Sequence, residues 1–133
     1  MTIRSVAIIG LGLLGGSIGL AVKARGLPVT TTGWDRDASV RERAAARGLV
    51  GTVCETAEEA VTNADLVILC VPVGAMADAA RAIAPGLAPH AIVSDVGSSK
   101  AAVAEALAEA LPGACVIPAH PVAGTEQSGP DAG

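Results

Sequence analysis

The chain has 133 residues, enough for one domain with a sizeable core, and 51% of them are hydrophobic. The net charge of −4 and the lack of any Lys/Arg cluster argue against nucleic acid, whose binding depends on cationic contacts to phosphate. Phe and Tyr are absent and Trp occurs once, so the core must consist of Val, Ile, Leu and Ala, as in parallel strands under Ala-rich helices.

Strand and helix patterns alternate from the start of the chain. The predicted elements are a buried strand over 5–10, a helix over 14–25, a strand over 29–35 and a solvent-facing helix over 38–47. The first helix is expected to place Ile18, Ala21 and Val22 on one face. Thr56 and Glu59 match a capping box, which predicts the start of another helix there.

The alternation continues in the second half of the chain. The predicted elements are a central strand over 65–73, a helix over 75–84, a strand within 91–100 that runs into a Gly/Ser loop, a helix over 99–111 and a strand over 114–121. Such alternation predicts an α/β fold, a doubly wound parallel sheet with right-handed crossovers. Residues 120–133 hold turn residues with no element after them, so we expect residues 1–133 to be the first domain of a longer protein.

The spacing of the cysteines and the lengths of the apolar runs predict the cellular compartment of the protein. Cys54, Cys70 and Cys115 have neither metal-site nor disulfide spacing, so we expect buried, reduced thiols, no metal and a cytoplasmic protein. Residues 5–22 carry no charge, but their pattern continues into a helix and a further strand, unlike a signal peptide. The longest later uncharged run, 66–77, is too short for a membrane span, which needs about 20 apolar residues.

The glycine-dense stretch GLGLLGGSIG, residues 10–19, lies between the first strand and the first helix. Gly10 permits a tight turn, Gly12 allows backbone to approach a pyrophosphate, and Gly15 allows close packing of helix on strand. The phosphates would then meet free N–H groups at a helix N-terminus. This stretch predicts a dinucleotide-binding domain of the Rossmann type.

Asp35 ends the second predicted strand, twenty residues after Gly15, where a carboxylate can accept hydrogen bonds from the adenine ribose. A carboxylate would repel a 2′-phosphate, so the sequence favours NAD over NADP. The neighbouring Arg36 leaves NADP open, because an Arg can receive that phosphate.

Ligands of such sheets bind beyond the carboxyl ends of the strands. The loops expected there are 71–75, 95–100 and 119–130, and the last two are rich in polar residues. His120 is the only His at a strand end, which favours a catalytic role, whereas His90 in LAPHA is expected to be an exposed turn residue.

Four stretches in this order and spacing resemble the nucleotide-binding domain of the prephenate and arogenate dehydrogenases of tyrosine biosynthesis. They are GLGLLGGSIGLA (10–21), VPV (71–73), SDVGSSK (94–100) and, most specifically, HPVAGTEQSGP (120–130). The resemblance covers essentially the whole chain.

The resemblance implies an oxidative decarboxylation, of prephenate to 4-hydroxyphenylpyruvate or of arogenate to tyrosine, with hydride passing to the nicotinamide. His120 would accept the hydroxyl proton as hydride leaves. Ser98 would bond the same hydroxyl or His120, and Thr125 and Glu126 would shape the substrate pocket. The cofactor-binding residues would be those of the glycine turn, the second strand end and the VPV stretch, namely Gly10, Gly12, Leu13, Leu14, Gly15, Asp35, Arg36, Val71 and Pro72.

Members of that family carry a second, helical domain that forms a homodimer and supplies cations for the substrate carboxylates. This chain lacks it, so the chain alone is expected to be inactive. Two other readings stay open. One is a two-domain 3-hydroxyacid dehydrogenase of the 6-phosphogluconate type, and the other is a non-catalytic module that senses NAD.

Overall fold

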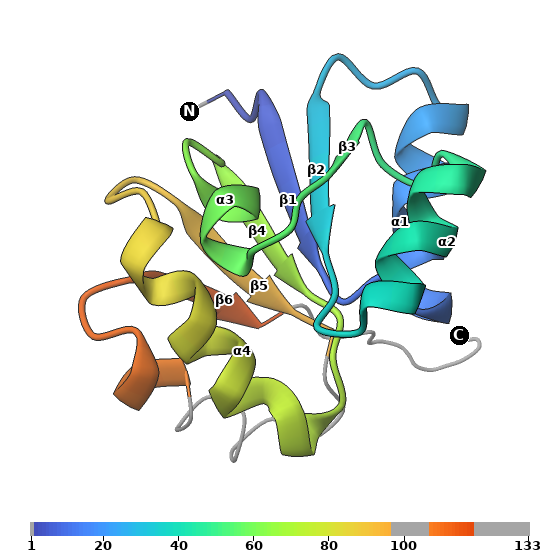
Figure 1. Cartoon of the computed structure of the whole chain (residues 1–133). Coiled ribbons are helices and arrows are strands. Elements are labelled where there is room, and N and C mark those ends of the chain that lie inside the picture. The colour runs from blue at the N-terminus through green and yellow to red at the C-terminus, as the bar shows by residue number, and fades with distance from the viewer. Residues whose placement is uncertain (1, 97–106, 119–133) are drawn as a thin grey trace, which may run out of the picture.

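A computed structural model describes residues 2–96 and 107–118 (Figure 1). Six parallel strands form one sheet in the order β3-β2-β1-β4-β5-β6. The strands are β1 (Ser5–Ile9), β2 (Thr30–Trp34), β3 (Thr52–Val53), β4 (Leu66–Leu69), β5 (Ile92–Asp95) and β6 (Cys115–Pro118). The chain starts in the middle of the sheet, builds one edge and then the other, which confirms the doubly wound Rossmann-type fold.

Helices cover both faces of the sheet. They are α1 (Leu13–Ala24), α2 (Ala38–Arg47), α3 (Ala57–Val61) and α4 (Met76–Ile83), with 3-10 turns at Val73–Ala75 and Ala84–Gly86 and helical residues at 107–110. In Figure 1, α1 and α2 lie to one side of the sheet and α3 and α4 to the other. Within the described ranges no helix is long and apolar enough to cross a bilayer.

Two apolar clusters hold these layers together. Alternate residues of the same strand enter different clusters, as the period of a strand requires: Ile9 packs under α3 and α4, whereas Ile8 packs under α1 and α2. Both side chains are fully buried. The central strands of the parallel sheet are therefore buried on both faces, by aliphatic side chains.

Several predicted boundaries move. The strand predicted over 65–73 ends at Leu69, because Pro72 cannot donate to a ladder and the chain turns at Val73–Ala75. β3 was not predicted, since two residues are too few to show a period. The capping box is confirmed in its first half, because the Thr56 hydroxyl accepts a bond from the Glu59 N–H at 3.1 Å. Most of the helix predicted over 99–111 lies outside the described residues, and its last residues are helical.

The prediction for the cysteines is wrong in part. All three thiols are free, but Cys115 is exposed and Cys54 and Cys70 are only half-buried. The reason for Cys115 is its position on β6, at the edge of the sheet, on the face opposite to α3 and α4.

The buried face of α1 consists of glycines rather than the predicted Ile18, Ala21 and Val22. Gly15, Gly16 and Gly19 are buried, whereas Ala21 is exposed and the other two predicted residues are half-buried. A Cβ on Gly15 would lie 1.8 Å from the Gly10 carbonyl oxygen, and one on Gly19 would lie 2.1 Å from that of Leu49. The helix thus approaches neighbouring backbone more closely than any side chain would permit.

We expect Gly19→Ala to lower the free energy of unfolding by about 1–3 kcal/mol, because the added methyl group overpacks the contact with Leu49. At an exposed glycine in a helix, the same substitution would instead raise the free energy of unfolding by roughly 0.5–1 kcal/mol. Urea denaturation measures the difference, with exposed Ser17→Ala as a control that changes stability by less than about 0.5 kcal/mol. An increase in stability of Gly19→Ala would contradict the close contact.

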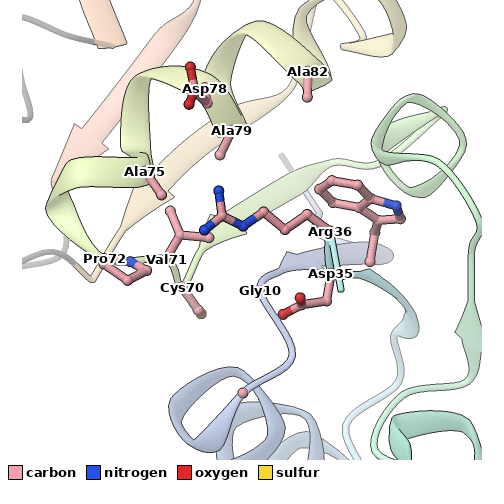
Figure 2. Close-up of a pocket in the computed structure, with 12 residues that line it drawn as sticks. Gly10, Asp35, Arg36, Cys70, Val71, Pro72, Ala75, Asp78, Ala79 and Ala82 are labelled. Carbon is pink, nitrogen blue, oxygen red and sulfur yellow. The ribbon is translucent and has the colours of Figure 1, made fainter. Parts of the chain in front are cut away.

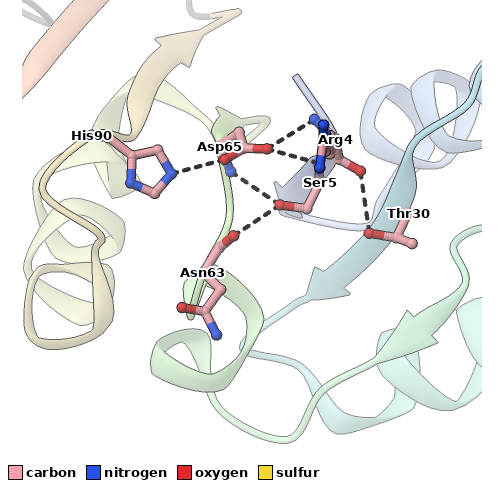
Figure 3. Close-up of polar contacts among 6 residues, drawn as sticks. All are labelled: Arg4, Ser5, Thr30, Asn63, Asp65 and His90. Carbon is pink, nitrogen blue, oxygen red and sulfur yellow. Dashed lines mark hydrogen bonds and ion pairs between the residues drawn. The ribbon is translucent and has the colours of Figure 1, made fainter. Parts of the chain in front are cut away.

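The amino ends of the strands are joined through Asp65 (Figure 3). Its Oδ2 accepts bonds from the backbone N–H groups of Arg4 at 2.8 Å and Ser5 at 3.2 Å, and its Oδ1 lies 2.8 Å from His90 Nε2. His90 is an exposed turn residue as predicted, with this additional ion-pair partner. The Arg4 N–H first, and then His90, hold the pKa of Asp65 below its ordinary value of 3.8.

Asp65→Asn should destabilise the protein at neutral pH, since the amide has one acceptor oxygen where the carboxylate has two. Because the folded-state pKa is depressed, the advantage of the wild type is fully present above pH 3.8 and is lost as pH falls through the folded-state pKa. Urea titrations of both proteins from neutral to acidic pH measure that advantage. An advantage that stayed constant at the most acidic pH would contradict this account.

Candidate functional site

The glycine turn leaves the sheet between β1 and α1. Gly10 has a φ of +99°, which favours glycine, and a Cβ there would lie 2.4 Å from the Cys70 carbonyl oxygen. Its N–H donates to the Trp34 carbonyl at 2.7 Å. The turn is therefore held between the ends of β2 and β4, in the centre of the carboxyl edge of the sheet.

The N-terminus of α1 is suited to bind an anion. Its N-cap, Gly12, offers no side-chain acceptor, and the first turn contains no acidic residue. The first N–H groups of a helix lack intrahelical partners and carry partial positive charge. A Cβ on Gly12 would meet no atom within 4 Å, so the space in front of these N–H groups is open.

Asp35 is fixed beside this helix end by backbone. Its Oδ2 accepts from the Leu11 N–H and its Oδ1 from the Asp37 N–H, both at 2.9 Å. Arg41 donates to the Asp35 carbonyl oxygen at 2.6 Å. The carboxylate thus has a defined direction, and lone pairs on both oxygens remain for a ligand hydroxyl.

A cavity of about 390 Å³ opens along the carboxyl edge between the glycine turn and α4 (Figure 2). Its size falls in the range of small-molecule sites. Figure 2 shows the Arg36 side chain extending from the β2 side of the cavity toward α4. The lining residues are Gly10, Gly12, Trp34, Asp35, Arg36, Cys70, Val71, Pro72, Ala75, Asp78, Ala79 and Ala82.

Six of the nine predicted cofactor-binding residues meet in this cavity, namely Gly10, Gly12, Asp35, Arg36, Val71 and Pro72. The other three do not line it. Leu13 and Leu14 lie in the first turn of α1 with 92% and 51% of their surface exposed, so only their backbone N–H groups are suited to the role predicted for them. Gly15 is covered by the Gly10 carbonyl and acts through packing.

Sequence reasoning missed the α4 wall of the cavity. Ala75, Asp78, Ala79 and Ala82 recur at the spacing of one helical face, and this pattern of small residues could have indicated a wall that faces a ligand. Asp78 forms an ion pair with Arg81 on the same helix. Trp34 was recognised only as the single aromatic residue, and its ring also lines the cavity.

Cys70 lines the cavity without being suited to nucleophilic chemistry. Burial raises the pKa of its thiol to about 11, so the thiol is protonated at neutral pH. Among the described residues no group of three or more His, Cys, Asp or Glu side chains could hold a metal ion.

The predicted catalytic and substrate residues, His120, Ser98, Thr125 and Glu126, lie outside the described residues. The strands that precede them are described: β5 ends at Asp95 and β6 at Pro118, in register with Leu69 of β4. Asp95 is a buried carboxyl group at this edge that sequence reasoning did not single out.

Comparison with known proteins identifies the family to which this chain is similar. A family model for the nucleotide-binding domain of prephenate dehydrogenase matches residues 18–133. The cyclohexadienyl dehydrogenase of Zymomonas mobilis is 47% identical over 130 residues, which are 98% of this chain and 44% of that protein.

Two solved structures carry the same fold. Prephenate dehydrogenase from A. aeolicus, in complex with hydroxyphenyl propionate and NAD+, matches with a TM-score of 0.79 and 27% identity, over 99% of this chain and 46% of that one. Synechocystis arogenate dehydrogenase matches with a TM-score of 0.78 and 32% identity, over 93% and 43%. This chain spans less than half the length of each of these relatives. With its glycine turn, fixed Asp35 and carboxyl-edge cavity, the chain belongs to the prephenate dehydrogenase family and has the fold of that family's nucleotide-binding domain.

Proposed function

We propose that the complete protein is an NAD-dependent dehydrogenase that oxidatively decarboxylates prephenate or arogenate, and that residues 1–133 are its dinucleotide-binding domain. The observation that carries this proposal is the uncapped N-terminus of α1, which opens into the same cavity as the fixed carboxylate of Asp35. The relatives supply the substrate class, since they are named cyclohexadienyl, prephenate and arogenate dehydrogenases.

The residues present fit a dinucleotide. The free N–H groups at the start of α1 would hold the pyrophosphate, because Gly12 leaves the approach open. Asp35 would accept hydrogen bonds from the adenine ribose hydroxyls. Arg36, Val71 and Pro72 would border the nucleoside within the cavity.

The fixation of Asp35 supports NAD over NADP. A carboxylate held by the N–H groups of Leu11 and Asp37 cannot swing aside without breaking both bonds. A 2′-phosphate would therefore meet a negative charge that stays in place. Arg36 is exposed and extends toward α4, so it is free to cover the adenine without neutralising Asp35.

We assign the remaining chemistry to residues that follow β5 and β6 in the sequence. His120 would take the proton of the substrate's 4-hydroxyl, and Ser98 would hold that hydroxyl or the imidazole in position. The bound nicotinamide would accept the hydride while the substrate loses carbon dioxide and becomes aromatic. Thr125 and Glu126 would shape the pocket, and a second, helical domain would bind the substrate carboxylates and form a homodimer.

Two other functions are weighed against this one. A 3-hydroxyacid dehydrogenase would use the same first domain, but the family match favours the prephenate enzymes. A non-catalytic NAD sensor would bind the dinucleotide without turnover. An assay of the complete protein with prephenate and arogenate, each with NAD and NADP, separates the proposed function from both alternatives, because only the proposed enzyme would change the nicotinamide absorbance with these acids. Binding without turnover of either acid would refute the proposed function.

The first prediction concerns cofactor choice. Asp35→Asn removes the fixed charge at nearly constant size, so the ratio of NAD to NADP affinity should fall by about tenfold or more, equivalent to about 1.4 kcal/mol. Calorimetric titration of the complete protein with each dinucleotide measures the ratio.

The control is Asp78→Asn, which removes the same charge from the opposite wall of the cavity, where Arg81 already compensates it. Its ratio should stay near that of the wild type. Equal shifts in both variants would mean that the general field of the cavity, and not Asp35, sets the preference.

The second prediction concerns proton transfer. His120→Asn in the complete enzyme should lower kcat by about 10²–10⁴, the usual contribution of a positioned acid–base group, with little change in NAD affinity. The wild type should lose activity on acidification, as the imidazole becomes protonated, and the variant should lack that limb.

His90→Asn is the matched control, because His90 lies beside Asp65 at the opposite edge of the sheet. Its kcat and pH profile should resemble those of the wild type. If His120→Asn raised KM and left kcat near normal, His120 would be a binding group.

A further inference from the structure

The main chain that leaves β2 is held by a backbone donor at the end of the strand and by a side chain just beyond it. The carbonyl of Trp34, the last residue of β2, accepts the Gly10 N–H at 2.7 Å. The Asp35 carbonyl comes next, past the strand, and its donor is Nη1 of Arg41 at 2.6 Å. A guanidinium on α2 therefore holds the peptide that carries the Asp35 carboxylate.

Arg41 is itself placed by the start of α2. Asp37 is the N-cap, and its carboxylate accepts bonds from the backbone N–H of Ser39 at 2.9 Å and from its hydroxyl at 2.8 Å. The Asp37 carbonyl accepts the Arg41 N–H at 3.1 Å. Ala44, in the next turn, is buried in the cluster under α1 and α2. The turn that carries Arg41 is thus fixed on both sides, and its guanidinium has a defined reach to Asp35.

We propose that Arg41 is a positioning residue for cofactor selection, which holds the Asp35 main chain and so sets the preference for NAD over NADP without touching the dinucleotide. This inference rests on the proposed function, in which Asp35 receives the adenine ribose. The bond from the Asp37 N–H to the Asp35 carboxylate joins two residues of one loop, so it moves with that loop. Among the described bonds of Asp35, those to Leu11 and Arg41 tie it to its surroundings.

A direct role for Arg41 predicts the opposite result. An Arg near the adenine ribose can receive a 2′-phosphate and thereby favour NADP. Arg36 has the position for that role, because it is exposed and borders the cavity. Arg41 is half-buried, does not line the cavity and donates to a backbone carbonyl. Loss of Arg41 should therefore weaken the preference for NAD, whereas loss of a phosphate ligand would strengthen it.

The test is Arg41→Met in the complete protein, which keeps an apolar stem and removes the hydrogen-bond donors. Calorimetric titration should give a ratio of NAD to NADP affinity that is about three- to tenfold below that of the wild type, as expected for coupled neighbours. In the Asp35→Asn background the same substitution should change the ratio by less than about twofold, because Arg41 acts through the Asp35 carboxylate. A ratio that rises or stays constant, or one that falls equally in both backgrounds, would overturn the proposal.

Arg47→Met is the matched control, since Arg47 is exposed in the last turn of α2 and its loss removes the same charge from the same helix. Its ratio should stay within about twofold of the wild-type value. An equal fall in both variants would mean that the charge of α2, and not the bond to Asp35, sets the ratio. Turnover with an unchanged Arg41→Met ratio would refute this inference alone, and a shifted ratio without turnover would refute the proposed function alone.

Hydrogen exchange of the ligand-free protein tests the same link without a dinucleotide. The amides of Leu11 and Asp37 both donate to the Asp35 carboxylate, so in Arg41→Met they should exchange at least about tenfold faster than in the wild type. The Ser5 amide donates to Asp65 at the opposite edge of the sheet and should keep its rate. Unchanged rates at Leu11 and Asp37 would contradict the proposal, and so would an equal acceleration of all three amides, which indicates general destabilisation.

Discussion

The close contact between α1 and the turn before it is the constraint on which the rest of the site depends. Gly15 lies so near the Gly10 carbonyl that a Cβ would overlap it, and a Cβ on Gly19 would likewise overlap the carbonyl of Leu49. This contact sets the helix against the sheet so that its N-terminus opens at the carboxyl edge. A bulkier face would move the helix outward and carry its N–H groups away from Asp35.

The two edges of the sheet are used differently. At the amino edge, Asp65 joins the starts of β1 and β4 to the turn before β5, so the polar groups there bond to one another. At the carboxyl edge, the N-terminus of α1 has no side-chain cap. The described hydrogen bonds of Asp65 therefore tie the amino edge together, whereas the cavity opens at the carboxyl edge.

Asp35 has both a structural and a binding role. The hydrogen bonds that hold the glycine turn beside α2 also set the direction of its carboxylate. The Leu11 N–H belongs to the glycine turn and the Asp37 N–H to the start of α2, so one side chain bridges the exits of β1 and β2. Ribose recognition would use the lone pairs that these bonds leave. The same fixation makes a negative 2′-phosphate an unfavourable ligand at this position.

The sequence by itself determined the fold class, the glycine turn and the acid at the end of β2, because short β-branched runs, glycine spacing and helix stops are local signals. It also placed α2 correctly from its charge pattern and from the glycine after it. It failed for the buried face of α1, since a helix that packs through glycines buries positions that hydrophobic periodicity ignores.

Only the tertiary structure decided which residues meet across the sheet. The α4 wall of the cavity, the bonds to Asp65 and the exposure of Cys115 depend on strand order, which places segments far apart in sequence beside one another. Leu69, Asp95 and Pro118 share one register although 49 residues separate the first from the last. Local patterns carry no information about such neighbours, because they arise when the strands pair and the helices cover them.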